Sequence, residues 1–405
     1  MVLFTGKGGV GKTTTAAATA VAGARSGIAT LVLSTDAAHS LGDALDRDLS
    51  GPAASGPVEI EPNLSALQVS GRTYFEGTWT VVQAYLVETL GALGVDPVVA
   101  EEMTSLPGAE EIAALLELRA QVESGRWELI VVDCAPTAET LRLLALPENL
   151  AWHLGRFIPG GPGMRRAARP AAAAALGIPL PGPEVLQVIK GWHDDMLAVH
   201  RLLSGDRSSV RLVTTPESVV IAESRRTWTS LSLYGYAVDA VVVNKILPSP
   251  GGDDGIGAAV TWLQSWNAAQ ARGVAEVVQS FAGVPIVRSP YLAREPIGPD
   301  ALAELADGLD TSMLVGHGLR DSVATSPMRV DRTADGFTLA VHLPLTSARD
   351  VGLQRREDEL ILTVGDHRRI VTLPSVLTRC VVSGASVRGG SLAVSFVPDP
   401  MLWPR

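Results

Sequence analysis

Short apolar runs of strand length alternate with longer segments of helical periodicity from residue 1 to about residue 310. The runs typical of buried strands are residues 1–5, 28–34, 127–133, 210–214, 237–244 and 284–288. The main segments with helical spacing around them are residues 14–25, 185–203, 217–233, 260–278 and 299–309. Continuous apolar strands separated by helices are typical of a parallel sheet that is covered on both faces. The pattern therefore predicts an α/β fold with a doubly wound, mainly parallel sheet, in which residues 64–69 form an edge strand.

Residues from about 71 to 205 carry mostly helical periodicity around the strand at 127–133, and we expect them to form a helical insertion. An apolar stripe at helical spacing stands out within it, made of Ile112, Leu115, Leu116 and Leu118. Ordinary core packing is the simpler explanation of such a stripe, and a binding groove is the alternative. The sequence leaves both open.

The helical pattern stops at a composition break near residues 311–326. Beyond it, short alternating runs are separated by turns such as Asp335-Gly336, which predicts a small all-β sandwich. We therefore expect an α/β domain at residues 1–312, a linker at 313–326 and the sandwich at 327–398. His342 and His367 are isolated, and the alternation predicts no partner for either. We expect the sandwich to recognise polypeptide, and a purely structural cap is the alternative.

Composition narrows the possible functions. The 405 residues are 46% hydrophobic and 19% charged, which is enough apolar material for sizeable cores. A net charge of −10 gives no electrostatic support for binding nucleic acid. The only cysteines, Cys134 and Cys380, lie far apart, which argues against a disulfide framework, a zinc cluster or an iron–sulfur cluster. We expect neither a membrane span nor a signal peptide, and the expected compartment is the cytoplasm.

The stretch Gly6-Lys7-Gly8-Gly9-Val10-Gly11-Lys12-Thr13 fits the phosphate-loop pattern G-x-x-x-x-G-K-[ST] between a predicted strand and a predicted helix. Backbone N–H groups of such a loop close around phosphate oxygens, with Lys12 on the β- and γ-phosphates and the Thr13 hydroxyl on Mg²⁺. The predicted nucleotide-binding residues of the loop are Gly8, Gly9, Val10, Gly11, Lys12, Thr13 and Thr14. The sequence thus predicts a P-loop NTPase that binds ATP with Mg²⁺. Lys7 is a second lysine in the loop, and a solvated surface lysine is its simplest explanation.

Three polar residues follow predicted buried strands, where a doubly wound sheet binds its ligands. Asp36 is placed beside the nucleotide by this topology. Asp133 ends an apolar run at the position of a Walker-B aspartate, which would hold the Mg²⁺ shell, although a surface acid at a strand end is the alternative. Asn244 could pair with a purine edge through its amide, and a turn-forming Asn explains it equally well.

Three motifs in this order resemble one family. They are the phosphate loop, Asp36-Ala37-Ala38-His39-Ser40, and Asp133-x-Ala135-Pro136-Thr137-x-x-Thr140-Leu141-Arg142. Together they resemble the arsenite-pump ATPase family, which includes the targeting ATPases for tail-anchored membrane proteins, over about residues 1–310. Residues 327–398 more weakly resemble the α-crystallin domain of small heat-shock proteins, with Gly390-Ser391-Leu392 near its G-x-L signature.

The resemblance implies roles for several of these residues. Lys7 would be the signature lysine that reaches a partner subunit's nucleotide. Asp36 would orient or deprotonate the attacking water. The catalytic residues implied by the family are therefore Asp36, Lys7 and Lys12. Asn244 and the pair Pro290-Tyr291 would contact the adenine base. The family also implies a nucleotide-gated homodimer across the nucleotide face. The implied client is a hydrophobic polypeptide, so that contact with a membrane is only indirect, through the client.

Departures from the family pattern limit the resemblance. The C-x-x-C pair that binds zinc in targeting members and the arsenite-binding cysteines are both absent, so arsenite stimulation is not expected. Ala37 stands where the family has Pro, and Ala138 where it has Gly, changes that could slow switching without abolishing hydrolysis. An ATP-dependent interaction scaffold with slow hydrolysis and a partitioning-type ATPase remain as alternatives to a client-binding ATPase.

Overall fold

The computed structural model describes residues 1–36, 40–49, 56–69, 76–96, 99, 109–155, 179, 181–248, 258–309 and 328–403. The chain forms two compact units. The first contains Met1–Gln68, Trp127–Leu141 and Ser204–Arg405, and the second contains Val69–Arg126 and Arg142–Leu203. The motif residues Ala37, Ala38 and His39 and the expected linker at 313–326 lie outside the described residues.

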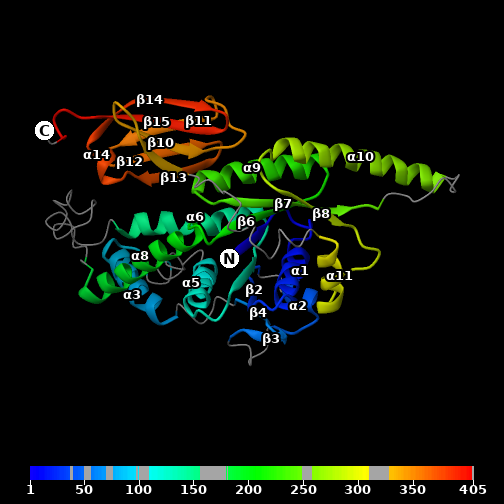
Figure 1. The fold of residues 1–405 in the computed structure, drawn as a ribbon. Coiled ribbons are helices and arrows are strands. Elements are labelled where there is room, and N and C mark those ends of the chain that lie inside the picture. The colour runs from blue at the N-terminus through cyan, green and yellow to red at the C-terminus, as the bar shows by residue number, and fades with distance from the viewer. Residues whose placement is uncertain are drawn as a thin grey trace. The chain divides into compact units, whose positions relative to one another are not determined.

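The first unit is built on an eight-stranded sheet of order β3-β4-β2-β5-β1-β6-β7-β8 (Figure 1). Its strands are β1 (Val2–Thr5), β2 (Thr30–Ser34), β3 (Val58–Glu61), β4 (Leu64–Gln68), β5 (Leu129–Asp133), β6 (Ser209–Thr214), β7 (Val238–Ile246) and β8 (Ile286–Pro290). All neighbours are parallel except β3, which pairs antiparallel with β4. The predicted doubly wound α/β fold is confirmed. The prediction that residues 64–69 form the edge was wrong, because β3 covers them.

Helices cover both faces of this sheet (Figure 1). One face carries α1 (Lys12–Arg25), α2 (Ser40–Leu45) and α11 (Pro299–Asp307), and the other carries α9 (Ser218–Tyr234) and α10 (Ala258–Ser280). Ala16, Ala17 and Ala20 of α1 are fully buried against the sheet. Their small side chains let the helix lie close to β1 and β5, which fixes the position of the loop in front of it.

The C-terminal part of the same unit is a β-sandwich, as predicted. A four-stranded sheet of order β14-β15-β10-β9 faces a three-stranded sheet of order β11-β12-β13. The elements are β9 (Met328–Arg332), β10 (Phe337–His342), β11 (Val351–Arg356), β12 (Glu359–Val364), β13 (His367–Thr372), α14 (Ser375–Thr378), β14 (Cys380–Arg388) and β15 (Ser391–Pro398). Leu233 of α9 is fully buried within the core of this sandwich.

The two histidines of the sandwich do have neighbours, so that expectation was wrong. The His342 ring lies edge-on to Trp228, with ring centroids 6.1 Å apart. The His367 ring lies edge-on to Tyr234 at the same separation of 6.1 Å. Both partners belong to α9, and strand periodicity carries no information about contacts with a helix so distant in the chain.

The second unit is helical. It contains α3 (Glu76–Ala92), α5 (Ala109–Glu123), α8 (Pro183–Leu203) and most of α6 (Thr137–Gly155). Both α3 and α5 pack on α8, and Arg119 of α5 pairs with Asp195 of α8 at 2.6 Å. Within the described ranges, no helix is long and apolar enough to cross a membrane.

Candidate functional site

The phosphate loop lies between β1 and α1, at the carboxyl end of the sheet. Gly11 has a φ of +90°, and a Cβ atom there would lie 2.3 Å from Nδ2 of Asn244. A Cβ atom on Gly6 would lie 2.1 Å from the carbonyl oxygen of Val213. The loop therefore requires glycine at both positions, because its backbone passes too close to β6 and β7 for a side chain.

The end of β7 holds this loop through two hydrogen bonds. Asn244 Nδ2 donates to the Val10 carbonyl at 2.8 Å, and Lys245 Nζ donates to the Gly9 carbonyl at 2.7 Å. Lys245 has a φ of +58°, an uncommon left-handed conformation that sits at an irregularity in the pairing of β7 with β8. Asn244, expected to reach a base, therefore uses one amide N–H to hold the loop.

The two loop lysines have different surroundings. Lys12 is buried, and its Nζ donates to the Lys7 carbonyl at 3.4 Å. The Lys7 side chain is 38% exposed and lies 3.9 Å from the carboxylate of Glu223 on α9. Lys7 thus has a weak partner within its own chain and enough freedom to leave it.

A buried carboxylate faces the start of α1. Asp133 at the end of β5 is fully buried, and neither of its oxygens makes a hydrogen bond of ordinary geometry within the described part of the chain. Burial raises the pKa of Asp133 to about 7, opposed by the Thr13 hydroxyl and the Lys12 charge and reinforced by the charge of Asp36. A bound cation would stabilise the charged form of a carboxylate that is buried in this way.

Other buried polar atoms at the same edge of the sheet have no hydrogen-bond partner among the residues that the structure describes. They include the hydroxyl oxygens of Thr5 at the end of β1, Thr35 after β2 and Thr137 at the start of α6. Buried polar groups are usually paired, so a cluster of unpaired ones points to a ligand. Oxygen donors from Thr13, Asp133 and Asp36 are the kind that Mg²⁺ prefers, and the donor set therefore fits that ion.

Asp36 is positioned by residues that the sequence did not single out. Gln68, the last residue of β4, donates from Nε2 to the Asp36 carbonyl at 2.7 Å, and the Asp36 N–H donates to Ser34 Oγ at 3.2 Å. Ser40 at the start of α2 lies 3.3 Å from the Thr13 hydroxyl. The signal that could have revealed Gln68 and Lys245 was their place at the carboxyl ends of predicted strands of the same parallel sheet.

A cavity of about 790 Å³ opens over the loop. Of the residues predicted from the sequence, it is lined by Gly8, Gly9, Gly11, Lys12, Thr13, Thr14, Asp36, Asn244, Pro290 and Tyr291. Val10 is buried beneath the loop, Asp133 is buried facing the start of α1, and the Lys7 side chain points toward α9. The cavity has the size of a cofactor site, and its walls carry both signs of charge.

The match of the chain to known protein families decides which family it belongs to. The description "Anion-transporting ATPase" matches residues 1–311, and "HSP20-like domain found in ArsA" matches residues 334–396. The chain belongs to the ArsA/Get3 family of anion-transporting ATPases. It is an ATPase of this family with a C-terminal HSP20-like domain, and the family implies that it binds ATP.

Some of the similar proteins match nearly the whole chain and others match part of it. The uncharacterized protein SCO2128 of Streptomyces coelicolor is 37% identical over 100% of this chain and 99% of its own length. A protein of Prosthecochloris vibrioformis with the provisional name arsenical pump-driving ATPase is 32% identical over 98% of this chain and 95% of its own. The ATPase GET3B of Arabidopsis thaliana is 33% identical over 61% of this chain and 64% of its own.

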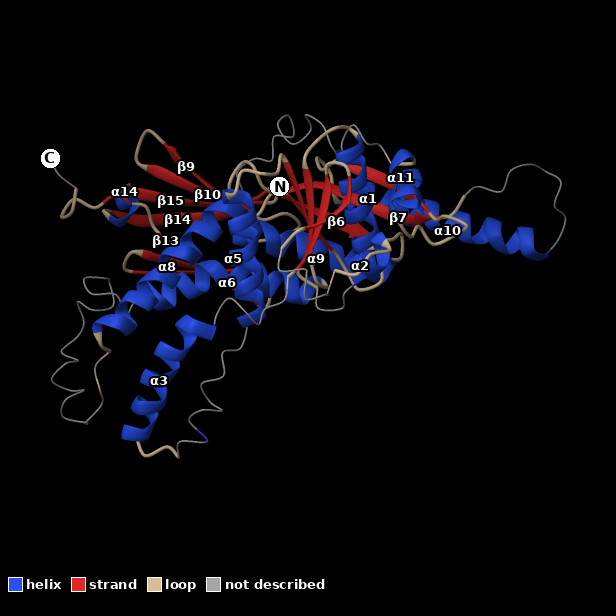
Figure 2. Ribbon diagram, turned by 90° about the horizontal axis from the view of Figure 1, so that it is seen from below, coloured by secondary structure: helices blue, strands red, loops and turns tan. Residues whose placement is uncertain are grey.

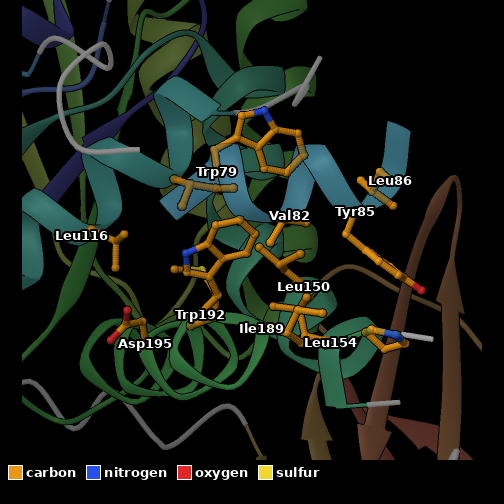
Figure 3. Close-up of a pocket in the computed structure, with 13 residues that line it drawn as sticks. Trp79, Val82, Tyr85, Leu86, Leu116, Leu150, Leu154, Ile189, Trp192 and Asp195 are labelled. Atoms are coloured by element: carbon orange, nitrogen blue, oxygen red, sulfur yellow. The ribbon is translucent and has the colours of Figure 1, made fainter. Parts of the chain in front are cut away.

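The helical unit of this ArsA/Get3-family ATPase contains a second cavity, of about 260 Å³ (Figure 3). Its walls come from α3, α5, α6 and α8 and the segment before α8, and they are apolar apart from Asp195 at the edge. Trp79 and Trp192 stack at one side with ring centroids 6.0 Å apart. Ile112 and Leu116 of the predicted apolar stripe line this cavity, while Leu115 and Leu118 are buried elsewhere.

Proposed function

We propose that the protein is a Mg²⁺-dependent ATPase that works as a homodimer and binds a hydrophobic protein client. The observation that supports this most is the set of loop, buried acid and unpaired hydroxyls at one edge of the sheet, in a chain whose family is ATPases. We further propose that residues 1–312 are the ATPase domain, 313–326 the linker and 327–398 the sandwich.

The chain's own residues have separate roles in this proposal. Backbone N–H groups from Gly8 to Thr14 bind the phosphates, and Lys12 neutralises the β- and γ-phosphates. Asp36 accepts a proton from, or orients, the attacking water, since Gln68 fixes its backbone at the mouth of the cavity. Thr13 and Asp133 hold Mg²⁺, which when bound supplies positive charge to the phosphate oxygens.

The second copy would supply Lys7. Within the described part of its own chain, this lysine forms a 3.9 Å ion pair with Glu223, and its own phosphate site already has Lys12. A surface pair of this kind is worth about 0.2–1 kcal/mol, so a phosphate group can displace it. Nucleotide bound by both copies would then favour the closed dimer.

The client would bind at the apolar cavity of the helical unit. Its volume of about 260 Å³ and its apolar walls fit large apolar side chains of a client.

Steady-state ATP hydrolysis and ATP binding test the catalytic part of this proposal. Lys12→Ala should abolish ATP binding, whereas Asp36→Asn should keep binding and reduce kcat by about 100-fold or more. A pull-down with the Asp36→Asn protein and ATP then asks whether an apolar protein co-purifies. Equal turnover in the wild type and Asp36→Asn would refute the role of Asp36.

An ATP-dependent scaffold with slow hydrolysis is the second candidate. The favouring observation is the close contact of the sandwich with α9, the helix that also carries the partner of Lys7. If the protein is a scaffold, the wild type and the Asp36→Asn protein should bind the partner equally well, because hydrolysis in the wild type is too slow to release it.

A further inference from the structure

A pair of exposed tryptophans lies on the N-terminal half of α10, away from both cavities. Trp262 is 60% exposed and Trp266 is 42% exposed, and their rings lie 5.8 Å apart. The chain has eight tryptophans, and the other six are half-buried or buried. Figures 1 and 2 both show one end of α10 extending beyond the strands of the sheet.

This helix half carries no charged side chain. Arg272 is the first charged residue of α10, which begins at Ala258. A helix that lies on an anionic membrane needs a Lys- and Arg-rich polar face, which is missing here. Trp is one of the residues most enriched at the centres of protein–protein interfaces, so a protein partner fits this surface better.

We propose that the Trp262–Trp266 face of α10 docks against the same face of a second copy of this chain and anchors the homodimer. This inference rests on the homodimer proposed above. In a two-fold contact each residue meets residues of the identical surface, so like charges face one another. With a net charge of −10 the chain repels a copy of itself over most of its surface. An uncharged, aromatic face avoids that cost.

The exposed indoles supply part of the area that a dimer needs. The exposed fractions of Trp262 and Trp266, 60% and 42%, add up to about one whole indole per chain, so a symmetric pair can bury roughly 300–500 Å² of indole surface. Specific interfaces bury about 1,000 Å² or more, and neighbouring backbone and side chains supply the rest.

The face is also tied to the nucleotide loop. Gln270, on the next turns of α10, donates from Nε2 to the Lys245 carbonyl at 3.0 Å and accepts from the Leu247 N–H at 2.9 Å. Lys245 in turn donates to the Gly9 carbonyl of the loop at 2.7 Å. A continuous set of hydrogen bonds therefore joins the loop to the helix that carries the tryptophans. Nucleotide that orders the loop would also fix the direction of this helix.

The test replaces both tryptophans by a good helix former, as Trp262→Gln with Trp266→Gln, in the full chain. Sedimentation over a range of concentrations, with ATP and Mg²⁺ present, gives the dimer dissociation constant. We expect it to rise about 30-fold or more, as for two interface anchors. Tryptophan emission of the wild type should shift to the blue as the dimer forms, and this shift should vanish in the double variant.

Val278→Gln is the matched control. Val278 is 47% exposed on the same helix but lies about 160° around it from Trp262, and its loss should leave the dimer unchanged. ATP affinity and the thermal midpoint should be the same in all three proteins, which shows that each is folded.

The outcomes separate this inference from the proposed function. If the wild type dimerises and the double variant does so equally well, this inference is overturned while the homodimer stands. If the wild type stays monomeric with ATP, the homodimer itself fails and the inference with it, although ATP binding still supports the ATPase. If the monomer instead binds phosphatidylcholine vesicles through these tryptophans, the face meets lipid and the inference is overturned.

Discussion

Lys7 and Glu223 form a loose ion pair, 3.9 Å from ammonium to carboxylate, that joins the phosphate loop to α9. Glu223 lies about one and a half turns before Trp228 and Thr229, which contact the C-terminal sandwich. One helix therefore carries both the partner of the loop lysine and part of the sandwich interface. The pair itself is weak, so its value lies in where it holds Lys7 rather than in stability.

Glu223→Gln tests this role. Without the carboxylate, Lys7 has no competing charge at that point, so we expect the ATP-bound dimer to tighten by about 1.5- to 5-fold. The measurement is the dimer dissociation constant with ATP. Lys7→Gln serves as the paired control and should weaken the dimer in either background. Tightening that persists in the Lys7→Gln, Glu223→Gln double variant would show that Glu223 acts through another group.

The apolar cavity of the helical unit should bind a small aromatic probe. Val82 lines it and is almost fully buried, so Val82→Phe should fill the cavity, weaken probe binding about tenfold or more, and cost about 1–3 kcal/mol of stability. Ala92→Phe adds the same ring at an exposed position of α3 and is the control. The readout is fluorescence titration with an apolar dye, followed by competition with an apolar peptide. Unchanged dye affinity in Val82→Phe would place the binding elsewhere.

His342 should make the contact between sandwich and α9 sensitive to acid. Burial lowers the pKa of His342 below its ordinary value of 6.5. As the pH falls toward and below 6.5, the folded protein therefore binds fewer protons than the unfolded chain. The contribution of neutral His342 to stability is complete above that pH and is lost below it. His342→Gln should flatten the dependence of the free energy of unfolding on pH between about 6.5 and 5. Parallel pH profiles in denaturant melts of the two proteins would contradict this.

Much of the fold could be predicted because buried parallel strands are continuous apolar runs. The strands β3, β9 and β11 were missed, since most of their side chains are exposed or only half-buried. They are held by backbone pairing with better-marked neighbours, and no residue pattern reports that. Because β3 was not predicted, β4 was expected to be the edge strand.

The candidate site was predictable where one short motif carries the chemistry. The phosphate loop, Asp36 and Asp133 belong to that class, because each stands next to a recognisable strand. Gln68 and Glu223 were missed, since their roles depend on elements brought together only in the folded chain. Asn244 shows a third case, in which the position was predicted and the contact with the loop carbonyl was not.

The last prediction concerns removal of the sandwich. Leu233 at the end of α9 is fully buried within the sandwich core, and the Leu233 carbonyl accepts a hydrogen bond from the buried Arg369 at 2.8 Å. Thr229 donates to the Pro344 carbonyl at 2.8 Å. A chain that ends at Leu309 would expose Leu233 and Trp228, each worth about 1.5–3 kcal/mol when buried. We expect this truncation to lower the thermal midpoint and to cause aggregation, which favours the cap over an independent sandwich.

Leu233→Gln separates exposure of α9 from a general failure to fold. In the truncated chain this change removes one of the newly exposed apolar side chains, the one fully buried within the sandwich core, so it should improve solubility and ATP binding. In the full chain the same change places a polar group in the sandwich core and should cost about 2–5 kcal/mol of stability. If the sandwich covers α9, the same substitution therefore improves the behaviour of the truncated chain and destabilises the full chain. A truncated chain that melts like the full protein and loses only its binding of unfolded polypeptide would instead support an independent, polypeptide-recognising sandwich.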